Sequence, residues 1–317
     1  MKKISILIPA YNEAPVLDKL FTRLANLANE TKKYEFEFLF VNDGSKDKTL
    51  ELIKDYADTD SRVSYINLSR NFGKEIGMIA GLDHVTGDAT VVIDADLQDP
   101  PELIPQMIAL WEEGYDDVYA KRNSRDGESF FKKFSSKMYY KILQSLTRIE
   151  IQKDTGDFRL LDRRVVEALK QFRESQRNTK AMFSLVGFHK KEILYDRDAR
   201  AAGETGFNYF KLIELAIDGI TSFTTSPLRI STYVGVLVSI STFIYLVVLI
   251  IRTIFFGADL AGYPSTMAVI LFLGGVQLLS LGIIGEYIGR IFNETKNRPL
   301  YLIEEYHNGQ LPSKTRR

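Results

Sequence analysis

The sequence predicts an α/β domain with a mostly parallel sheet, followed by a C-terminal hairpin of two membrane-spanning helices. Between Lys2 and about Ile220, short β-branched runs alternate with amphipathic helical segments, which is the pattern of a parallel sheet covered by helices. Further along, residues 230–251 and 260–285 contain no charged side chain. Each of these stretches reaches the roughly 20 apolar residues that a bilayer span requires.

The first strand is expected directly after Met1-Lys2-Lys3. This start does not favour a signal peptide, because the apolar run is short and ends in Tyr11-Asn12-Glu13 instead of a small-residue cleavage site. Strands are expected at Ile4–Ile8, Glu37–Val41, Ser64–Asn67 and Ala89–Ile93, with helices such as Ala14–Asn29 and Thr49–Ala57 between them and another beginning near Pro100 or Pro101.

The two uncharged stretches predict transmembrane helices at about 230–252 and 261–285, joined by a short loop. Basic residues flank this pair but are scarce in the loop, and such asymmetry places the flanks in the cytoplasm. We therefore expect an integral protein of the inner or plasma membrane whose domain and both termini are cytoplasmic. The basic residues concerned are Arg229 before the first span, Arg290, Lys296 and Arg298 after the second, and Arg252 in the loop.

These features divide the chain into a domain of residues 1–220, a hairpin of residues 229–290 and a cytoplasmic tail of residues 291–317. Within the domain, the segment near 121–148 interleaves basic and aromatic side chains, as an amphipathic helix at an anionic membrane surface does. A second interfacial helix is expected near 207–228. A solvated basic face packed on the domain is the alternative interpretation of the first segment.

The composition excludes several classes of function. With 41 basic and 41 acidic side chains, the formal net charge is zero, so the chain is not a polycation that binds nucleic acid over its whole surface. The sequence has no cysteine, and its three histidines, His84, His189 and His307, are far apart. Disulfide frameworks, thiolate zinc sites and histidine clusters are therefore excluded, and any metal should be a hard, oxygen-bound cation.

Polar motifs follow three of the expected strands. The first strand runs into Pro9-Ala10-Tyr11-Asn12-Glu13 and the second into Asn42-Asp43-Gly44-Ser45, where Asp43 can accept hydrogen bonds from a base or ribose. Taken alone, the second motif is ordinary turn chemistry. The fourth strand ends in Asp94-Ala95-Asp96-Leu97-Gln98, whose carboxylate and amide oxygens suit Mg²⁺ or Mn²⁺. Such metals complete their shells with substrate phosphates, which points to a nucleoside diphosphate.

In combination these motifs resemble glycosyltransferase family 2, whose nucleotide-sugar-binding fold is of the GT-A type. Asp94–Glu102, Asp154–Leu160 and Arg200–Thr205 are similar to the polyprenyl-phosphate glycosyltransferases, which include dolichol-phosphate mannose synthases and bactoprenol glucosyltransferases. The two-span hairpin is similar to the bactoprenol branch. Many relatives have Gly-Glu-Ser-Lys in the last motif, whereas this chain has Gly203-Glu204-Thr205-Gly206 and so lacks the lysine.

The resemblance implies a role for each motif. Pro9, Tyr11, Asn12, Glu13 and Asp43, with Asp94 and Asp96, would bind the donor nucleotide. Asp94, Asp96 and Gln98 would hold the metal, and Lys121, Arg122, Arg200 and Thr205 would bind the acceptor phosphate. Asp157, Asp96 and Arg200 would be the catalytic residues.

The implied reaction is a metal-dependent, inverting transfer of a hexose to polyprenyl (undecaprenyl) phosphate at the cytoplasmic membrane face. UDP-glucose is the first choice of donor, and the product would supply a cell-surface glycan or O-antigen modification. GDP-mannose, UDP-GlcNAc, UDP-galactose and UDP-aminoarabinose remain open, because sugar epimers differ by one hydroxyl whose partners linear spacing does not place. Paired hairpins are also compatible with a homo-oligomer.

The role of Asp157 is open between a general base and an orienting residue. A phosphate monoester has a second pKa of about 6, so the acceptor is already largely a dianion at neutral pH and needs little help from a base. Two rival functions are a processive polysaccharide synthase and a non-catalytic nucleotide-sugar sensor. The synthase is disfavoured because the sole tryptophan, Trp111, is not in a Gln-x-x-Arg-Trp motif, and the sensor because the acidic motif is intact.

Overall fold

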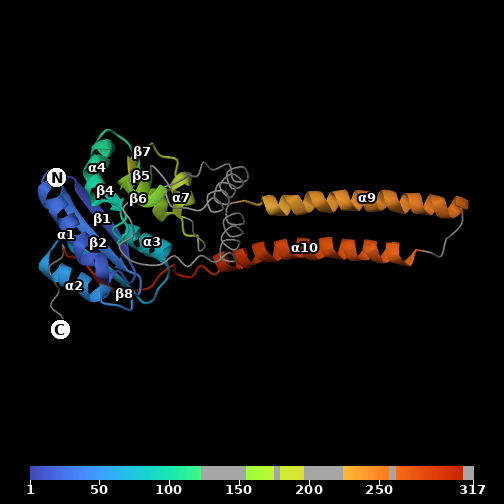
Figure 1. Ribbon diagram of the computed structural model, residues 1–317, viewed down its shortest axis with the longest axis horizontal. Helices are drawn as coiled ribbons and strands as arrows, with labels where there is room; N and C mark the ends of the chain where they lie inside the picture. Colours follow the sequence, from blue (N-terminus) through green and yellow to red (C-terminus); the bar gives the residue numbers. More distant parts are fainter. Residues whose placement is uncertain (123–154, 175–178, 196–223, 257–261, 310–317) are drawn as a thin grey trace. The chain divides into compact units, whose positions relative to one another are not determined.

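A computed structural model describes residues 1–122, 155–174, 179–195, 224–256 and 262–309 (Figure 1). The chain divides into two units, which are described separately. One is an α/β unit that combines the N-terminal part of the chain with the segment from Arg298 onward, and the other contains the long apolar helices.

Within the described residues, the α/β unit has one sheet of eight strands in the order β7-β5-β6-β4-β1-β2-β3-β8. The four strands expected from the sequence form its parallel centre, in which Ile6 of β1 pairs with Phe38 of β2 and Val91 of β4. The strands are β1 (Lys3–Ala10), β2 (Glu35–Asn42), β3 (Val63–Leu68), β4 (Ala89–Val92), β5 (Asp117–Arg122), β6 (Thr155–Asp162), β7 (Lys190–Tyr195) and β8 (Ile303–His307).

One side of the sheet departs from a purely parallel pattern. β6 lies between β4 and β5 and is antiparallel to both, while β7 is parallel to β5. The antiparallel direction brings the start of β6 to the sheet edge at which β4 ends. Gly156 and Asp157 thereby come to the same edge as the acidic motif after β4.

Helices cover both faces of the sheet (Figure 1). On one face α1 (Ala14–Glu30), α2 (Thr49–Thr59) and α4 (Ile104–Glu112) bury apolar side chains, and on the other α3 (Lys74–His84), α6 (Arg163–Lys170) and α7 (Thr179–Leu185) do so. A short 3₁₀ turn, Pro101–Leu103, precedes α4. A Cβ on Gly81 would lie 2.0 Å from Leu7 Cδ1, so glycine allows α3 to pack closely on β1.

The segment after the second apolar helix returns to the α/β unit, although the sequence suggests only a tail there. β8 pairs antiparallel with β3 and completes that edge of the sheet. Glu305 accepts hydrogen bonds from Lys54 Nζ (2.5 Å) and Tyr65 Oη (2.9 Å), and Asn67 Nδ2 donates to Glu304 Oε2 (2.9 Å). The C-terminal segment is therefore part of the folded domain.

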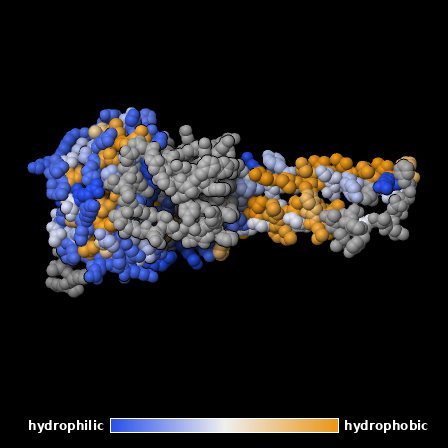
Figure 2. All heavy atoms as spheres, viewed as in Figure 1, coloured by the Kyte–Doolittle hydropathy of each residue, from blue (hydrophilic) through white to orange (hydrophobic). Residues whose placement is uncertain are grey.

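The second unit contains α9 (Ser226–Phe256) and α10 (Tyr263–Thr295), which extend beyond the expected spans at both outer ends. Both helices are long and apolar enough to cross a membrane, and apolar side chains cover their outer surfaces (Figure 2). Ser231 and Ser280 form an interhelical hydrogen bond of 2.8 Å. The exposed apolar side chains distinguish these two helices from the core helices of a soluble protein, which bury such side chains.

Candidate active site

A cavity of about 480 Å³ opens at the carboxyl edge of the parallel strands. The strand order reverses there, because β1 has β2 on one side and β4 on the other. Open α/β sheets bind their ligands at such a switch point. The lining residues come from the ends of β1 and β5, the loops after β1, β2, β3 and β4, and the starts of β6 and α3. They are Pro9, Ala10, Tyr11, Glu13, Asp43, Asn71, Lys74, Asp94, Ala95, Asp96, Asp99, Arg122, Gly156 and Asp157.

The cavity brings together most of the site residues predicted from the sequence. Asn12, Gln98 and Lys121 are described but do not line it. Arg200 and Thr205 lie outside the described residues, as do residues 123–148 and 207–223 of the two expected interfacial segments. The predicted residues that do line it are Pro9, Tyr11, Glu13, Asp43, Asp94, Asp96, Arg122 and Asp157.

Asn12 joins the two loops that form one wall. Its side-chain oxygen accepts a hydrogen bond from Lys46 N (2.8 Å), and its own backbone N–H donates to Ser45 Oγ (3.0 Å). The backbone of Asn12 is left-handed, with φ of 56°, a conformation that asparagine tolerates better than most residues. Asn12 therefore shapes the loop that carries Tyr11 and Glu13.

Asp43 is buried and holds the loop that leads into α3. Its two carboxylate oxygens accept hydrogen bonds from Phe72 N (2.7 Å) and Gly73 N (2.8 Å). Burial raises the pKa of Asp43, although these two backbone donors oppose the shift. Next to it, Gly44 has φ of 65°, and a Cβ there would lie 2.5 Å from Arg70 C, so the close loop contact requires glycine.

Replacing Asp43 with alanine is expected to release this loop, because two half-buried backbone N–H groups lose their acceptor. We expect faster amide hydrogen exchange at Phe72 and Gly73 and a free energy of unfolding lower by about 1–3 kcal/mol. Hydrogen exchange followed by mass spectrometry and chemical denaturation measure the two effects. Asp43→Asn keeps one acceptor oxygen and should lose less, and the exposed Asp58→Ala is the control. Unchanged exchange in Asp43→Ala would contradict the anchoring role.

The acidic motif after β4 forms a tight turn. Leu97 is in the left-handed region with φ of 59°, which is strained for a side chain of this size. Gln98 N donates to Asp96 Oδ1 (3.1 Å), and the Gln98 side chain is buried, with an Oε1 that has no hydrogen-bond partner among the described residues. The turn thus presents Asp94 and Asp96 to the cavity, whereas Gln98 does not line it.

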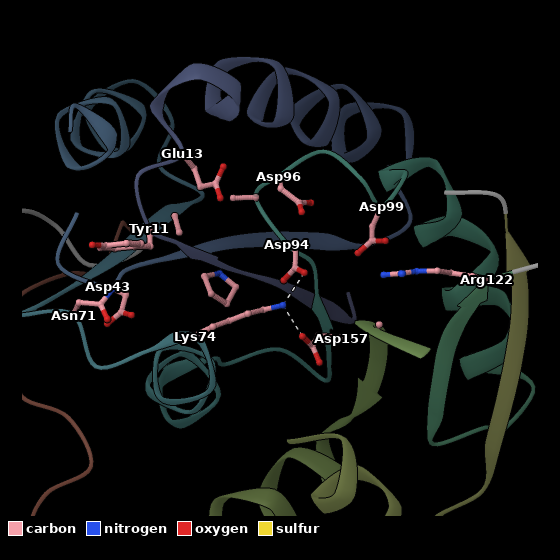
Figure 3. A pocket seen from close by; sticks show the side chains of 14 residues that line it. Tyr11, Glu13, Asp43, Asn71, Lys74, Asp94, Asp96, Asp99, Arg122 and Asp157 are labelled. Atoms are coloured by element: carbon pink, nitrogen blue, oxygen red, sulfur yellow. Dashed lines mark hydrogen bonds and ion pairs between the residues drawn. The ribbon is translucent and has the colours of Figure 1, made fainter. Parts of the chain in front are cut away.

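Lys74, which the sequence motifs do not single out, lies at the centre of the charged residues (Figure 3). Its Nζ donates to Asp94 Oδ2 (2.7 Å) and to Asp157 Oδ2 (2.5 Å). Burial lowers the pKa of Lys74, but the charges of the two carboxylates outweigh burial and hold that pKa above its usual value. A lysine in the first turn of α3 opposes the helix dipole. This unfavourable placement is the signal in the sequence that could have pointed to Lys74.

A second charged group lies around Asp99 and Arg122, to one side of Lys74 (Figure 3). Tyr195 Oη donates to Asp99 Oδ1 (2.5 Å), Arg122 is hydrogen-bonded to the same tyrosine, and burial followed by the charge of Asp99 raises the pKa of Tyr195. Arg122 Nε is buried and has no hydrogen-bond partner among the described residues. Lys121, one position earlier on β5, is paired instead with Glu192 (2.8 Å). Arg122 is therefore the cation of β5 that faces the cavity.

Two family models match this chain, each over a different part of it. A family model described as "Glycosyl transferase family 2" matches residues 5–170, and one described as "GtrB C-terminal hairpin" matches residues 226–291. The chain belongs to glycosyltransferase family 2. The family resemblance seen in the sequence and the GT-A-like fold with its two-helix hairpin are confirmed.

Relatives match this glycosyltransferase over nearly its full length. A Synechocystis sp. protein described as an "Uncharacterized glycosyltransferase" is 50% identical and covers 96% of this chain and 95% of its own. The SfII prophage-derived bactoprenol glucosyl transferase of Shigella flexneri is 45% identical, covering 97% and 99% of the two chains. The prophage bactoprenol glucosyl transferase homolog of Escherichia coli is 45% identical, covering 95% and 98%.

Two cavity carboxylates of this glycosyltransferase fit a hard divalent cation. Asp94 Oδ1 is buried and accepts no hydrogen bond from the described part of the chain, and Asp96 lines the same cavity. Mg²⁺ is commonly bound through one or two carboxylates, with waters and substrate phosphates as the other ligands. In the described ranges, no group of three or more histidine or acidic side chains is arranged to hold a metal. Asp94 and Asp96 would thus supply two of the ligands.

Proposed function

We propose that this enzyme transfers a hexose, with glucose from UDP-glucose as the first choice, to undecaprenyl phosphate or a similar polyprenyl phosphate. The observation that carries the proposal is a cavity lined by the carboxylates of Asp94 and Asp96 and by Arg122, in a chain that also has a two-helix apolar hairpin. Full-length similarity to bactoprenol glucosyl transferases supports the choice of acceptor and sugar.

In the proposed reaction, an oxygen of the acceptor phosphate attacks the anomeric carbon of the donor sugar with inversion. The bond from that carbon to the nucleoside diphosphate breaks, and the diphosphate leaves with the bonding electrons. Mg²⁺ or Mn²⁺ would neutralise charge that develops on this leaving group. Asp94 and Asp96 would hold the cation, and Tyr11, Glu13 and Asp43 would form the wall for the nucleoside.

Arg122 is the described residue best placed to bind the acceptor phosphate, since its guanidinium reaches the cavity and keeps an unused donor. Asp157 would orient the donor sugar or take a proton. Because the acceptor is already largely a dianion, it needs little help from a base, and we do not favour the general-base role over the orienting role. A pH–rate profile of Asp157→Asn separates them, since an orienting role predicts a lower rate with the ionisations retained.

The apolar hairpin would hold the active site at the membrane surface where the lipid phosphate lies. Basic residues beside the spans, Arg229, Arg290, Lys296 and Arg298, support a cytoplasmic position for the domain and both termini. The sugar-linked lipid would then serve as a donor for cell-surface glycan or O-antigen modification.

A turnover assay in oriented membrane vesicles tests the donor, the acceptor and the membrane face together. Radiolabelled UDP-glucose, GDP-mannose, UDP-GlcNAc, UDP-galactose and UDP-aminoarabinose are offered separately with undecaprenyl phosphate. We expect one glucosyl lipid product, formed from external UDP-glucose in inside-out but not right-side-out vesicles. Another productive donor would change the sugar, an extended glycan would indicate a processive synthase, and donor binding without turnover would indicate a sensor.

A further inference from the structure

Lys74 occupies the position between the two acidic parts of the active site. Its ammonium donates to Asp94 after β4 and to Asp157 on β6 (Figure 3). These two residues are far apart in the sequence. The two acidic side chains are largely buried, with exposed fractions of 18% and 13%. One cation therefore offsets part of the charge of both carboxylates.

The position of Lys74 is set by the fold, because the loop before it and the helix after it are both held in place. Asp43 binds the backbone of Phe72 and Gly73 immediately before it, and Gly81 allows the helix that follows to pack directly on Leu7. The side chain is about half exposed, and its ammonium is paired with both carboxylates. The fold thus fixes the backbone of Lys74 beside the acidic residues of the cavity.

A divalent cation on Asp94 and Asp96 would lie close to this ammonium. Asp94 would then share its carboxylate between the cation and Lys74, and charges of the same sign a few ångströms apart repel strongly in a partly buried site. The diphosphate of a nucleotide supplies negative charge to both cations. Repulsion between cation and lysine should therefore be greatest when the metal arrives without nucleotide.

We propose that Lys74 is a positioning residue that holds Asp94 and Asp157 together in the empty enzyme and disfavours a divalent cation that binds without nucleotide. This inference rests on the proposed metal site at Asp94 and Asp96. Nucleotide and metal then bind with positive coupling, since each lowers the electrostatic cost of the other. Divalent cations would then bind in the acidic cavity mainly together with the nucleotide donor.

The test measures Mn²⁺ binding to the full-length protein in detergent by electron paramagnetic resonance of free Mn²⁺, with and without UDP. Without nucleotide, Lys74→Met and Lys74→Gln are expected to bind Mn²⁺ at least about tenfold more tightly than the unsubstituted protein, and the tightening by UDP should shrink by a similar factor. Lys74→Arg keeps the charge and should stay close to the original affinity. Lys33→Met removes a lysine from another carboxylate pair (Lys33–Glu112, 2.5 Å) and is the matched control.

The inference is overturned if Lys74→Met and Lys74→Gln bind Mn²⁺ no more tightly than the unsubstituted protein. It is equally overturned if neither the two variants nor the unsubstituted protein binds Mn²⁺. It is also overturned if Lys33→Met produces the same gain as Lys74→Met. Asp96→Ala separates this result from the metal assignment, because that variant should weaken Mn²⁺ binding with UDP present, whatever Lys74 does. Transfer to lipid phosphate is assayed independently, so failure of the proposed function is recognised separately.

Discussion

Asp96→Ala is expected to lower kcat by at least about 10²- to 10³-fold, which is the typical cost of removing one preorganised electrostatic contact to a developing charge. Asp96 lines the cavity beside Asp94, and in the proposed reaction it holds the cation that neutralises the departing diphosphate. The side chain is only partly buried and lies in the loop after β4, so the fold should persist. Initial rates at saturating donor and lipid phosphate, measured across a Mg²⁺ and Mn²⁺ series, give the effect.

The exposed Asp58→Ala is the control for loss of one negative charge and should retain the original rate. Thermal unfolding of Asp96→Ala should stay close to that of the unsubstituted protein. Near-normal turnover of Asp96→Ala with metal present would show that this carboxylate does not hold the cation.

Arg159→Leu is expected to lower the free energy of unfolding by about 3–5 kcal/mol, because it leaves a buried charge without its partner. Arg159 and Asp117 are 1% and 0% exposed, and Arg159 Nη1 lies 3.1 Å from Asp117 Oδ2. The guanidinium also stacks 3.7 Å from the ring centroid of Phe183. Burial raises the pKa of Asp117 even with Arg159 in place, and the nearby Lys190 donates to the Phe183 carbonyl. Chemical denaturation of the purified protein measures the loss.

Two further variants show whether the pair itself is responsible. Arg164→Leu removes an arginine that is 70% exposed and paired with Asp116 and Asp162, so it should cost only about 0–1 kcal/mol. The double variant Arg159→Leu/Asp117→Leu should be more stable than Arg159→Leu alone, since neither charge is left unpaired. An Arg159→Leu protein as stable as Arg164→Leu would contradict the structural role, and a selective loss of kcat would place Arg159 in catalysis instead.

The central strands were predictable because each is a short apolar run that is buried on both faces. The direction of β6 was not, since antiparallel insertion between β4 and β5 depends on pairing with distant segments. β8 carried little signal for the same reason: Ile303–His307 is half polar, and its glutamates are satisfied by Lys54, Tyr65 and Asn67, which are remote in the sequence.

Asp43, Asp94 and Asp96 directly follow strands, and the structure places all three in the wall of one cavity, as the strand-end positions predicted. Positions that depend on side-chain direction were harder to predict. Lys121 and Arg122 are both cationic, yet alternation along β5 turns only Arg122 toward the cavity. Lys74 was missed because it belongs to no strand-end motif and gains its importance only when β6 brings Asp157 beside Asp94.

The position of β8 has a consequence for how the protein is made. Tyr65 on β3 meets Glu305 across a separation of 240 residues, so the ribosome must synthesise both apolar helices before the sheet can receive its last strand. Until then β3 is an open edge, the kind of surface that pairs with other chains. Completion of the sheet is thereby linked to synthesis of the apolar hairpin, and a chain truncated before residue 303 would keep β3 as an unpaired edge.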